Sequence, residues 1–319
     1  MAPQVDLGGK HIIVTGASPG SIGYETAKTL AAWGATVILT TRTHPDAVAK
    51  SIEDELKRAG VSATLDAYPL DLTNARSVSE FVRWYLNKYG ERLDVLVNNA
   101  GIHLDLLSRW KEPQLTADGF EIHWRTNYLG TMQLTHLLLP LLKQTGKMTG
   151  DARDVNVSSH LHNKGRNSDL FKRTRPYNSW EAYGNSKLAL VHSAFEIQRR
   201  FSGEFNLRGF VLHPGSISTN IAHKGLEGNR LLQGLRKLFV SLEAIILMTP
   251  HQGAQTQILC ATSPQAKGGV YYDRCEPGNP SKEAEDSGVA EKLWQETGHW
   301  VAGLNNLTRA ATNNLPEEA

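Results

Sequence analysis

The sequence contains little of several features that point to particular protein classes. Only two of its 319 residues are cysteines, Cys260 and Cys275, which is too few for a disulfide framework. They lack the C-x-x-C spacing of a zinc site, and the 12 histidines include no HExxH motif. We therefore expect neither a disulfide scaffold nor metal ligands.

Excess charge and long apolar runs are missing as well. The formal net charge is +2 at pH 7, so nucleic acid and anionic membranes are not expected as partners. The nearest candidate for a membrane span, KLFVSLEAIILMTP at 237–250, is shorter than the about 18 residues required and contains Glu243. The N-terminal MAPQVDLGGK lacks the charged and apolar blocks of a signal peptide. We predict no membrane span and a cytoplasmic protein.

Short apolar segments recur along most of the chain. They are rich in Val, Ile and Leu, a composition typical of strands that are buried on both faces. The predicted strands are 11–15, 36–40, 63–68, 93–97, 153–158, 207–212 and 269–272.

Amphipathic segments fill the intervals, and Gly34, Gly60 and Gly90 follow three of them where a helix would end. Strands that alternate with helices predict an α/β fold. We expect a Rossmann-type doubly wound domain, with a central parallel sheet of about seven strands flanked by helices. The predicted helices are 24–33, 46–59, 74–89, 117–144, 180–201 and 250–262.

No linker, composition break or internal repeat divides the sequence, so we predict a single domain over residues 1–302. The remaining segment 303–319, GLNNLTRAATNNLPEEA, is polar and lacks periodicity. We predict a mobile tail there.

Three glycines lie close together in HIIVTGASPGSIGY at 11–24, directly after the first predicted strand. A glycine-rich turn between a strand and a helix is the context of a phosphate-binding loop. Gly16 would permit a tight turn, Gly20 would let the backbone approach a pyrophosphate, and Gly23 would let the helix pack closely on the sheet. Taken alone, the loop also suits a structural turn without a ligand.

Tyr183 and Lys187 are four residues apart in a predicted helix, so their side chains project from one face. A phenol has a pKa of about 10, and a nearby ammonium group lowers it. The spacing therefore suits a tyrosine that donates a proton to a carbonyl oxygen and accepts one from an alcohol. An aromatic residue and a solvated lysine on one helix are the alternative.

Several motifs follow one another in a fixed order. Together they resemble the short-chain dehydrogenase/reductase family over roughly residues 8–300. The Gly loop, with one extra residue before its last glycine, is similar to that of fungal-type fatty acid synthase ketoreductase domains. The segment TPHQGAQTQILCATSP and the long interval between Ser159 and Tyr183 resemble the retinol-dehydrogenase-like branch. The motifs are TGASPGSIG at 15–23, DL at 71–72, NNAG at 98–101, NVSS at 156–159, YGNSK at 183–187 and HPGSIST at 213–219.

The resemblance implies a catalytic set of Asn127, Ser159, Tyr183 and Lys187. Tyr183 would be the general acid and base, while Ser159 would hydrogen-bond the substrate oxygen. Lys187 would hold the cofactor ribose and lower the tyrosine pKa, and Asn127 would hold a water that relays protons to Lys187. Ser158, a strand-end serine, is the neighbour that could be confused with Ser159.

The second predicted strand ends in TVILTTRTHPDA, with Arg42 near the position where an acidic residue binds the ribose of NAD. The first carboxylate after that strand is Asp46. Arginine suits the 2′-phosphate of NADP, so we predict NADP(H) in preference to NAD(H). An exposed strand-end arginine is the alternative. The cofactor-binding residues implied by the resemblance are Gly16, Ser18, Gly20, Ser21, Ile22, Asp71, Leu72, Asn99, Ala100, Gly101, Tyr183, Lys187, Pro214, Gly215, Ile217 and Thr219.

The sequence therefore predicts an NADP(H)-dependent oxidoreductase that interconverts a carbonyl and an alcohol on a small molecule. Segment 217–249 corresponds to the substrate lid of the family, and its leucines suit an apolar pocket wall or plain core packing. The alternative function is a catalytically idle NADP(H)-binding regulatory protein. Because relatives often pair through the helices that correspond to 117–144 and 180–201, a homodimer is a further expectation.

Overall fold

The computed structural model describes residues 1–90, 92–172, 175–215 and 248–313, and only the backbone of 305–313. Most of the predicted lid, including Ile217 and Thr219, therefore lies outside the described residues.

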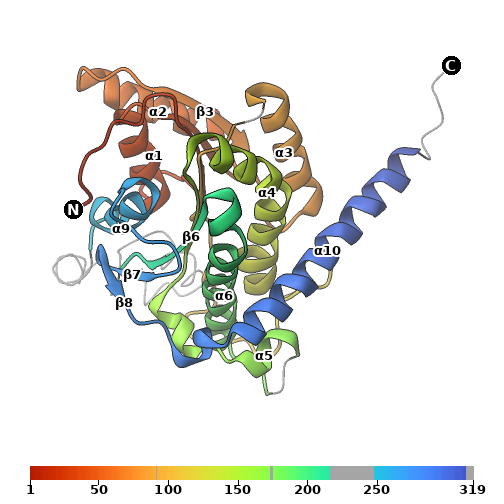
Figure 1. Cartoon of the computed structure of the whole chain (residues 1–319). Coiled ribbons are helices and arrows are strands. Elements are labelled where there is room, and N and C mark those ends of the chain that lie inside the picture. The colour runs from red at the N-terminus through yellow and green to blue at the C-terminus, as the bar shows by residue number, and fades with distance from the viewer. Residues whose placement is uncertain (91, 173–174, 216–247, 314–319) are drawn as a thin grey trace.

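Eight strands form the central sheet, in the order β3-β2-β1-β4-β5-β6-β7-β8 (Figure 1). Neighbours are parallel except β7 and β8, which pair antiparallel. The order reverses between β1 and β4, a switch point at which α/β sheets open a crevice at the carboxyl ends of their strands. The strands are β1 (His11–Thr15), β2 (Thr36–Thr41), β3 (Thr64–Pro69), β4 (Val95–Asn98), β5 (Ala152–Val157), β6 (Leu207–His213), β7 (Tyr271–Asp273) and β8 (Glu276–Gly278).

The predicted α/β fold is confirmed, and all seven predicted strands are present. The predicted number is one too low, because β8 was not recognised. This strand has only three residues and includes Pro277, which cannot donate a backbone hydrogen bond. A proline is tolerated here because β8 is an edge strand.

Helices cover both faces of the sheet (Figure 1). One buried cluster lies between the sheet and α1, α2 and α9, and the other lies between the sheet and α3, α4, α6 and α10. No helix in the described part of the chain is both long enough and apolar enough to span a membrane. The helices are α1 (Ile22–Ala32), α2 (Pro45–Arg58), α3 (Ala75–Tyr89), η1 (Trp124–Leu129), α4 (Gly130–Thr149), η2 (His160–Lys164), α5 (Asn167–Phe171), α6 (Ser179–Phe205), α9 (Pro250–Thr262), η3 (Lys282–Glu285) and α10 (Ser287–Asn313).

The helix predicted at 117–144 begins later than expected, and its first turn is a π-helix. Residues before Trp124 form a turn in which the Thr116 hydroxyl contacts the Asp118 carboxylate at 2.6 Å and the backbone carbonyl of Phe120 at 3.0 Å, and Gly119 has a φ of +82°. The chain then forms the π-helical turn η1, and α4 continues to Thr149. Side-chain hydrogen bonds to the local backbone compete with helix formation, which explains the late start.

Helix α10 extends into the segment predicted as a tail, because its backbone is helical to Asn313. It lies against α4 and α6 (Figure 1). The Trp294 ring is centred 4.3 Å from that of His136 on α4 and 5.7 Å from that of Phe201 on α6. Thr297 hydrogen-bonds the Tyr128 hydroxyl at 2.7 Å. Part of the surface that we expected to pair two copies is thus covered by the chain's own helix, and the homodimer stays a prediction.

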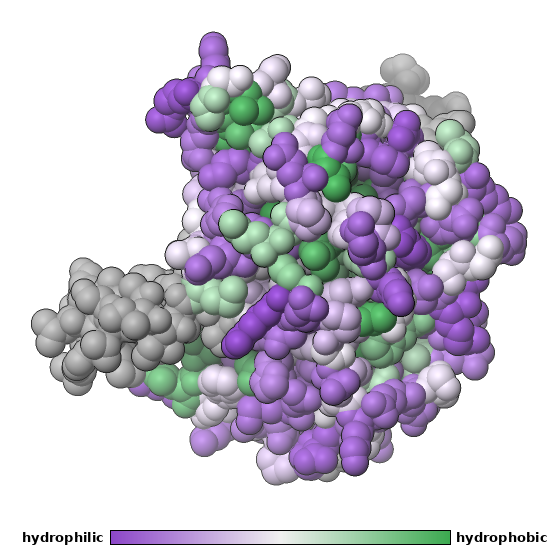
Figure 2. Space-filling view, turned by 60° about the vertical axis from the view of Figure 1, so that its left-hand side comes forward, coloured by the Kyte–Doolittle hydropathy of each residue, from purple (hydrophilic) through white to green (hydrophobic). Residues whose placement is uncertain are grey.

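The face of the molecule in Figure 2 carries mainly polar side chains, with apolar ones in small patches between them. This distribution is ordinary for a folded domain with its larger apolar residues inside. The exposed large apolar side chains among the described residues are Met1, Leu86, Leu107, Leu115 and Met148.

Candidate active site

A cavity of about 320 Å³ lies where the strand order reverses. Most of the residues predicted to bind a cofactor come together around it, although they belong to distant parts of the chain. Gly20 and Gly215 do not line this cavity. The predicted residues that line it are Gly16, Ser18, Ser21, Ile22, Arg42, Asp71, Leu72, Asn99, Ala100, Gly101, Tyr183, Lys187 and Pro214.

The glycine-rich loop holds the first turn of α1 against the end of β1. Gly16 has a φ of +72°, and a Cβ there would lie 2.7 Å from the Ala100 Cα, so only glycine fits. A Cβ on Gly23 would lie 2.6 Å from the Gly16 carbonyl oxygen, which agrees with the close packing expected for this residue. Ser21 is the N-cap of α1 and accepts a hydrogen bond from the Tyr24 N–H at 3.1 Å. The helix N-terminus therefore borders the cavity, where its dipole favours a phosphate.

The charges around the cavity are few. Among the described residues that line it, three have side chains of the Asp, Glu, Lys or Arg type: Arg42, Asp71 and Lys187. The Asp71 carboxylate accepts hydrogen bonds from the Thr73 N–H at 2.9 Å and hydroxyl at 2.7 Å. The end of β2 thus presents a cation, Arg42, and the nearby carboxylate already has partners. A cation at this position suits a phosphate group of a nucleotide cofactor.

The NNAG segment is fixed to the end of β1. The Asn99 side-chain amide donates to the Thr15 carbonyl at 2.8 Å. The backbone N–H groups of Asn99 and Ala100 each donate to the Thr15 hydroxyl at 3.0 Å. These contacts hold the floor of the cavity in one conformation.

Tyr183 and Lys187 lie near the start of α6, and both are buried at the cavity. The Lys187 ammonium nitrogen is 5.8 Å from the centre of the Tyr183 ring and donates to the Val157 carbonyl at 2.8 Å. The two serines after β5 have different partners. Ser159 hydrogen-bonds the Tyr183 side chain, whereas the Ser158 hydroxyl donates to the Lys187 carbonyl at 2.9 Å. Ser159 thus lies beside the tyrosine, whereas Ser158 is the one of these two serines that is among the residues lining the cavity.

Burial dominates the protonation of both groups. It raises the pKa of Tyr183 to about 12, and the hydrogen bond with Ser159 acts in the opposite direction. Burial also lowers the pKa of Lys187 to about 8. The predicted lowering of the tyrosine pKa is therefore wrong for the protein without cofactor. Burial destabilises the phenolate by more than the hydrogen bond from Ser159 stabilises it.

Asn127 lies in η1, within a π-helical turn of a kind often found at functional sites. Its amide accepts from the Ile102 N–H at 2.8 Å and donates to the Ile102 carbonyl at 2.9 Å and the Ser186 hydroxyl at 3.0 Å. A Cβ on Gly101 would lie 3.1 Å from the Lys187 Nζ and 3.4 Å from the Asn127 Oδ1. Asn127 and Lys187 thus both approach Gly101, and their predicted link through water stays a prediction.

Several lining residues were not named from the sequence. Most of them lie at the end of a strand or within three positions of a strand or recognised motif. That position is the sequence feature by which they could have been predicted. His103 stands out because its ring is stacked on that of Tyr183, with centres 4.0 Å apart and planes 13° apart. The additional lining residues are Thr40, Thr41, Thr43, Leu70, Ile102, His103, Leu104, Thr126 and Val157.

Solved structures share this architecture. An uncharacterised protein from Mycobacterium paratuberculosis is 29% identical with a TM-score of 0.64, and the match covers 92% of this chain and 95% of that one. A Pseudomonas aeruginosa RhlG/NADP active-site complex is 25% identical with a TM-score of 0.61, covering 85% and 96%. A 3-ketoacyl-(acyl-carrier-protein) reductase from Brucella melitensis, complexed with NADH, is 25% identical with a TM-score of 0.59, covering 83% and 96%.

Sequence comparison points the same way. Human retinol dehydrogenase 14 is 37% identical over 302 residues, which are 90% of this chain and 84% of the relative. Human retinol dehydrogenase 11 is 34% identical over 295 residues, with 91% and 85% covered. The family model for short chain dehydrogenases matches residues 10–229, from β1 past the tyrosine and lysine of α6. The chain is thus an oxidoreductase of the short chain dehydrogenase family, similar to its retinol dehydrogenases.

Proposed function

We propose that this protein is an NADP(H)-dependent oxidoreductase that interconverts a carbonyl and an alcohol on a lipophilic small molecule, with Tyr183 as the general acid and base. The observation that carries the proposal is that Tyr183 and Lys187 line one cavity together with the glycine-rich loop, while Ser159 hydrogen-bonds Tyr183. A lipophilic substrate follows from the similarity to retinol dehydrogenases.

Two groups would hold the phosphates of the dinucleotide. The turn at Gly16 and the N-terminus of α1 suit the pyrophosphate. Arg42, at the end of β2, suits a 2′-phosphate through a bidentate contact, and no Asp or Glu side chain follows β2 among the cavity-lining residues until Asp71. The solved relatives include complexes with NADP and with NADH, so the preference for NADP(H) rests on Arg42.

The proton would be moved by Tyr183. A nicotinamide cofactor, when bound, supplies or accepts the hydride. Because burial raises the pKa of Tyr183 to about 12, the hydroxyl is protonated at neutral pH, the state that donates to a carbonyl oxygen during reduction. Ser159, which hydrogen-bonds Tyr183, would hydrogen-bond the same oxygen and stabilise its developing negative charge. Lys187, whose pKa burial lowers to about 8, would contact the cofactor ribose and stabilise the tyrosinate that forms.

The test is the Tyr183→Phe variant, with NADPH absorbance followed on a panel of lipophilic aldehydes and ketones. We expect turnover to fall by roughly 10²- to 10⁴-fold while NADPH affinity, measured by fluorescence titration, is retained. Turnover at the wild-type rate would remove Tyr183 from this role. Tight NADPH binding by the wild-type protein without turnover of any compound would instead support the catalytically idle regulatory protein.

A further inference from the structure

We infer that His103 is a substrate-binding residue whose imidazole hydrogen-bonds a second oxygen of the substrate, close to the carbonyl or alcohol that reacts. This inference rests on the proposed function and narrows it: the substrate would be a lipophilic molecule with two neighbouring oxygen groups, such as a hydroxyketone or a dicarbonyl.

The position of His103 brings it next to the proton-transfer group. The residue comes two positions after NNAG, lines the same cavity as Tyr183 and Lys187, and is only 6% exposed. Its ring lies face to face with that of Tyr183 at 4.0 Å. His103 and Tyr183 therefore border the same part of the cavity.

The Nε2 of His103 is buried and has no hydrogen-bond partner in the described part of the chain. The neighbouring His123 shows the contrast, since its ring is centred only 6.0 Å away. Both His123 nitrogens are occupied, by the Glu121 carboxylate at 2.7 Å and by the Leu104 N–H at 2.9 Å. A buried polar group without a partner costs about 1–3 kcal/mol, and a ligand that hydrogen-bonds it recovers part of that cost.

Three other histidines also have a buried nitrogen without a partner among the described residues, but none of them lines the cavity. They are His11, His136 and His192. The side chains nearest to His103 along the chain, Ile102 and Leu104, line the cavity and are apolar. A single polar ring in such a wall fixes the orientation of a ligand.

The charge state of His103 selects the kind of group it would bind. Burial lowers its pKa to about 4, and the neighbouring His123 and Lys187 act in the same direction. The ring is therefore neutral at physiological pH and offers one N–H donor and one acceptor nitrogen. A hydroxyl or carbonyl oxygen matches these groups, whereas a carboxylate would gain no charge pairing.

The test uses two ligands that differ in one group, a long-chain methyl ketone and the matching hydroxymethyl ketone. Their dissociation constants are measured by calorimetry on the protein saturated with NADP⁺, so the result does not depend on turnover. We expect the wild-type protein to prefer the hydroxymethyl ketone. His103→Phe keeps an aromatic ring against Tyr183 and should weaken that ligand by about 10- to 100-fold, with the methyl ketone changed less than about threefold.

Two further variants separate this role from a structural one. His103→Asn retains a hydrogen-bonding group and should restore part of the preference. His136→Phe is the matched control, because it removes a buried imidazole with an unpartnered nitrogen outside the cavity and should leave both constants unchanged. Equal weakening of both ketones by His103→Phe, or no preference in the wild type, would overturn the inference. A preference without turnover would contradict the proposed function and leave the inference intact.

Discussion

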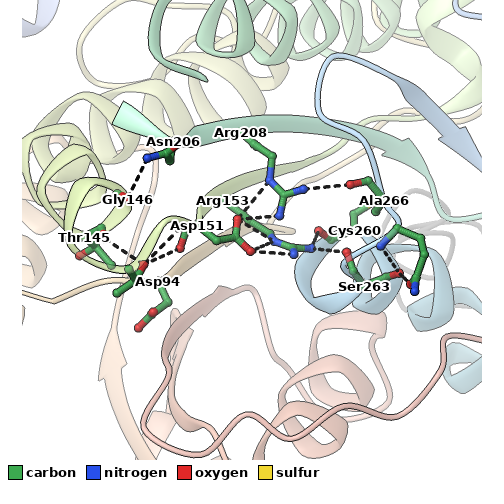
Figure 3. Close-up of polar contacts among 12 residues, drawn as sticks. Asp94, Thr145, Gly146, Asp151, Arg153, Asn206, Arg208, Cys260, Ser263 and Ala266 are labelled. Carbon is green, nitrogen blue, oxygen red and sulfur yellow. Dashed lines mark hydrogen bonds and ion pairs between the residues drawn. The ribbon is translucent and has the colours of Figure 1, made fainter. Parts of the chain in front are cut away.

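The two ends of the central sheet differ in whether their charged side chains have partners of opposite charge. At the amino-terminal ends of β5 and β6, Asp151 is held by two guanidinium groups (Figure 3). At the carboxyl-terminal ends, the buried Lys187 ammonium group has one hydrogen-bond partner among the described residues, the Val157 carbonyl. The ion pairs of Asp151 stabilise the amino-terminal end of the sheet. At the carboxyl-terminal end, the absence of an anionic partner for Lys187 among the described residues suits a group with a shifted pKa that takes part in a reaction.

The amino-terminal end forms a closed network. Arg153 donates to Asp151 at 2.8 Å and to the carbonyls of Cys260 at 2.9 Å and Ser263 at 3.0 Å, at the end of α9 (Figure 3). Arg208 donates to Asp151 at 2.7 Å. Burial acts to raise the pKa of Asp151, but the hydrogen bonds from the two arginines outweigh it and hold that pKa below its usual value. This cluster anchors α9 to the sheet.

The comparison is tested most strongly at Lys187. Its replacement by Met removes a buried charge from the carboxyl-terminal end, so we expect turnover to fall by roughly 10²- to 10⁴-fold. The melting temperature should stay the same or rise, because burial of the ammonium is unfavourable, as its lowered pKa indicates. Thermal unfolding and NADPH oxidation are measured together. A large fall in the melting temperature of the Lys187→Met variant would contradict the comparison, because charged groups would then stabilise both ends of the sheet.

The same substitution at the other end should do the reverse. Arg153→Met removes a buried partner of Asp151 and two donors to the end of α9, and we expect a loss of about 3 kcal/mol in the free energy of unfolding. NADPH affinity should change less than about threefold. Urea unfolding measures the effect, and Arg76→Met is the control, since its pair with Glu80 is exposed and should contribute under about 0.5 kcal/mol.

Asp154 lies between the two regions and has no cationic partner among the described residues. It is hydrogen-bonded to Asn156, to Asn98 at 3.1 Å and to Thr135 at 3.4 Å. Burial raises its pKa to about 7 from 3.8. The native state therefore binds more protons than the unfolded state between about pH 4 and 7, and its stability falls as pH rises through that window.

Asp154→Asn should remove that pH dependence. The raised pKa corresponds to at most about 4 kcal/mol at pH 7 and above, and the neutral amide is free of this cost. Urea unfolding at several pH values compares the variant with the wild type. If both lose stability equally between pH 4 and 7, the carboxyl group is not the origin of the slope.

The smallest expected effect is at the exposed end of β2. Arg42→Ala should weaken NADPH by about 10- to 100-fold and leave NADH nearly unchanged, because a charge-assisted contact contributes about 1.5–3 kcal/mol. Fluorescence titration with both cofactors measures the difference. Arg58→Ala, on the last turn of α2, is the control. Equal weakening of both cofactors would assign Arg42 to adenine or to the loop instead of the 2′-phosphate.

Much of the site was predictable because its signals are local. The glycine loop, NNAG and the tyrosine–lysine spacing each occupy a few consecutive residues, and the structure gathers them at one crevice. His103 gave no such signal, since its neighbour Tyr183 lies 80 positions further along the chain. Helix α10 was missed because its partners, such as His136 and Phe201, are even more distant in the sequence from Trp294.

The sequence by itself determined most of the order of strands and helices, the glycine-rich turn and the family resemblance, because periodicity, glycine positions and short motifs act over a few residues. Only the tertiary structure decided that the His103 ring stacks on Tyr183, and that burial raises the tyrosine pKa instead of lowering it. The reason is physical: desolvation depends on every atom packed around a group, and those atoms come from segments that only folding brings together.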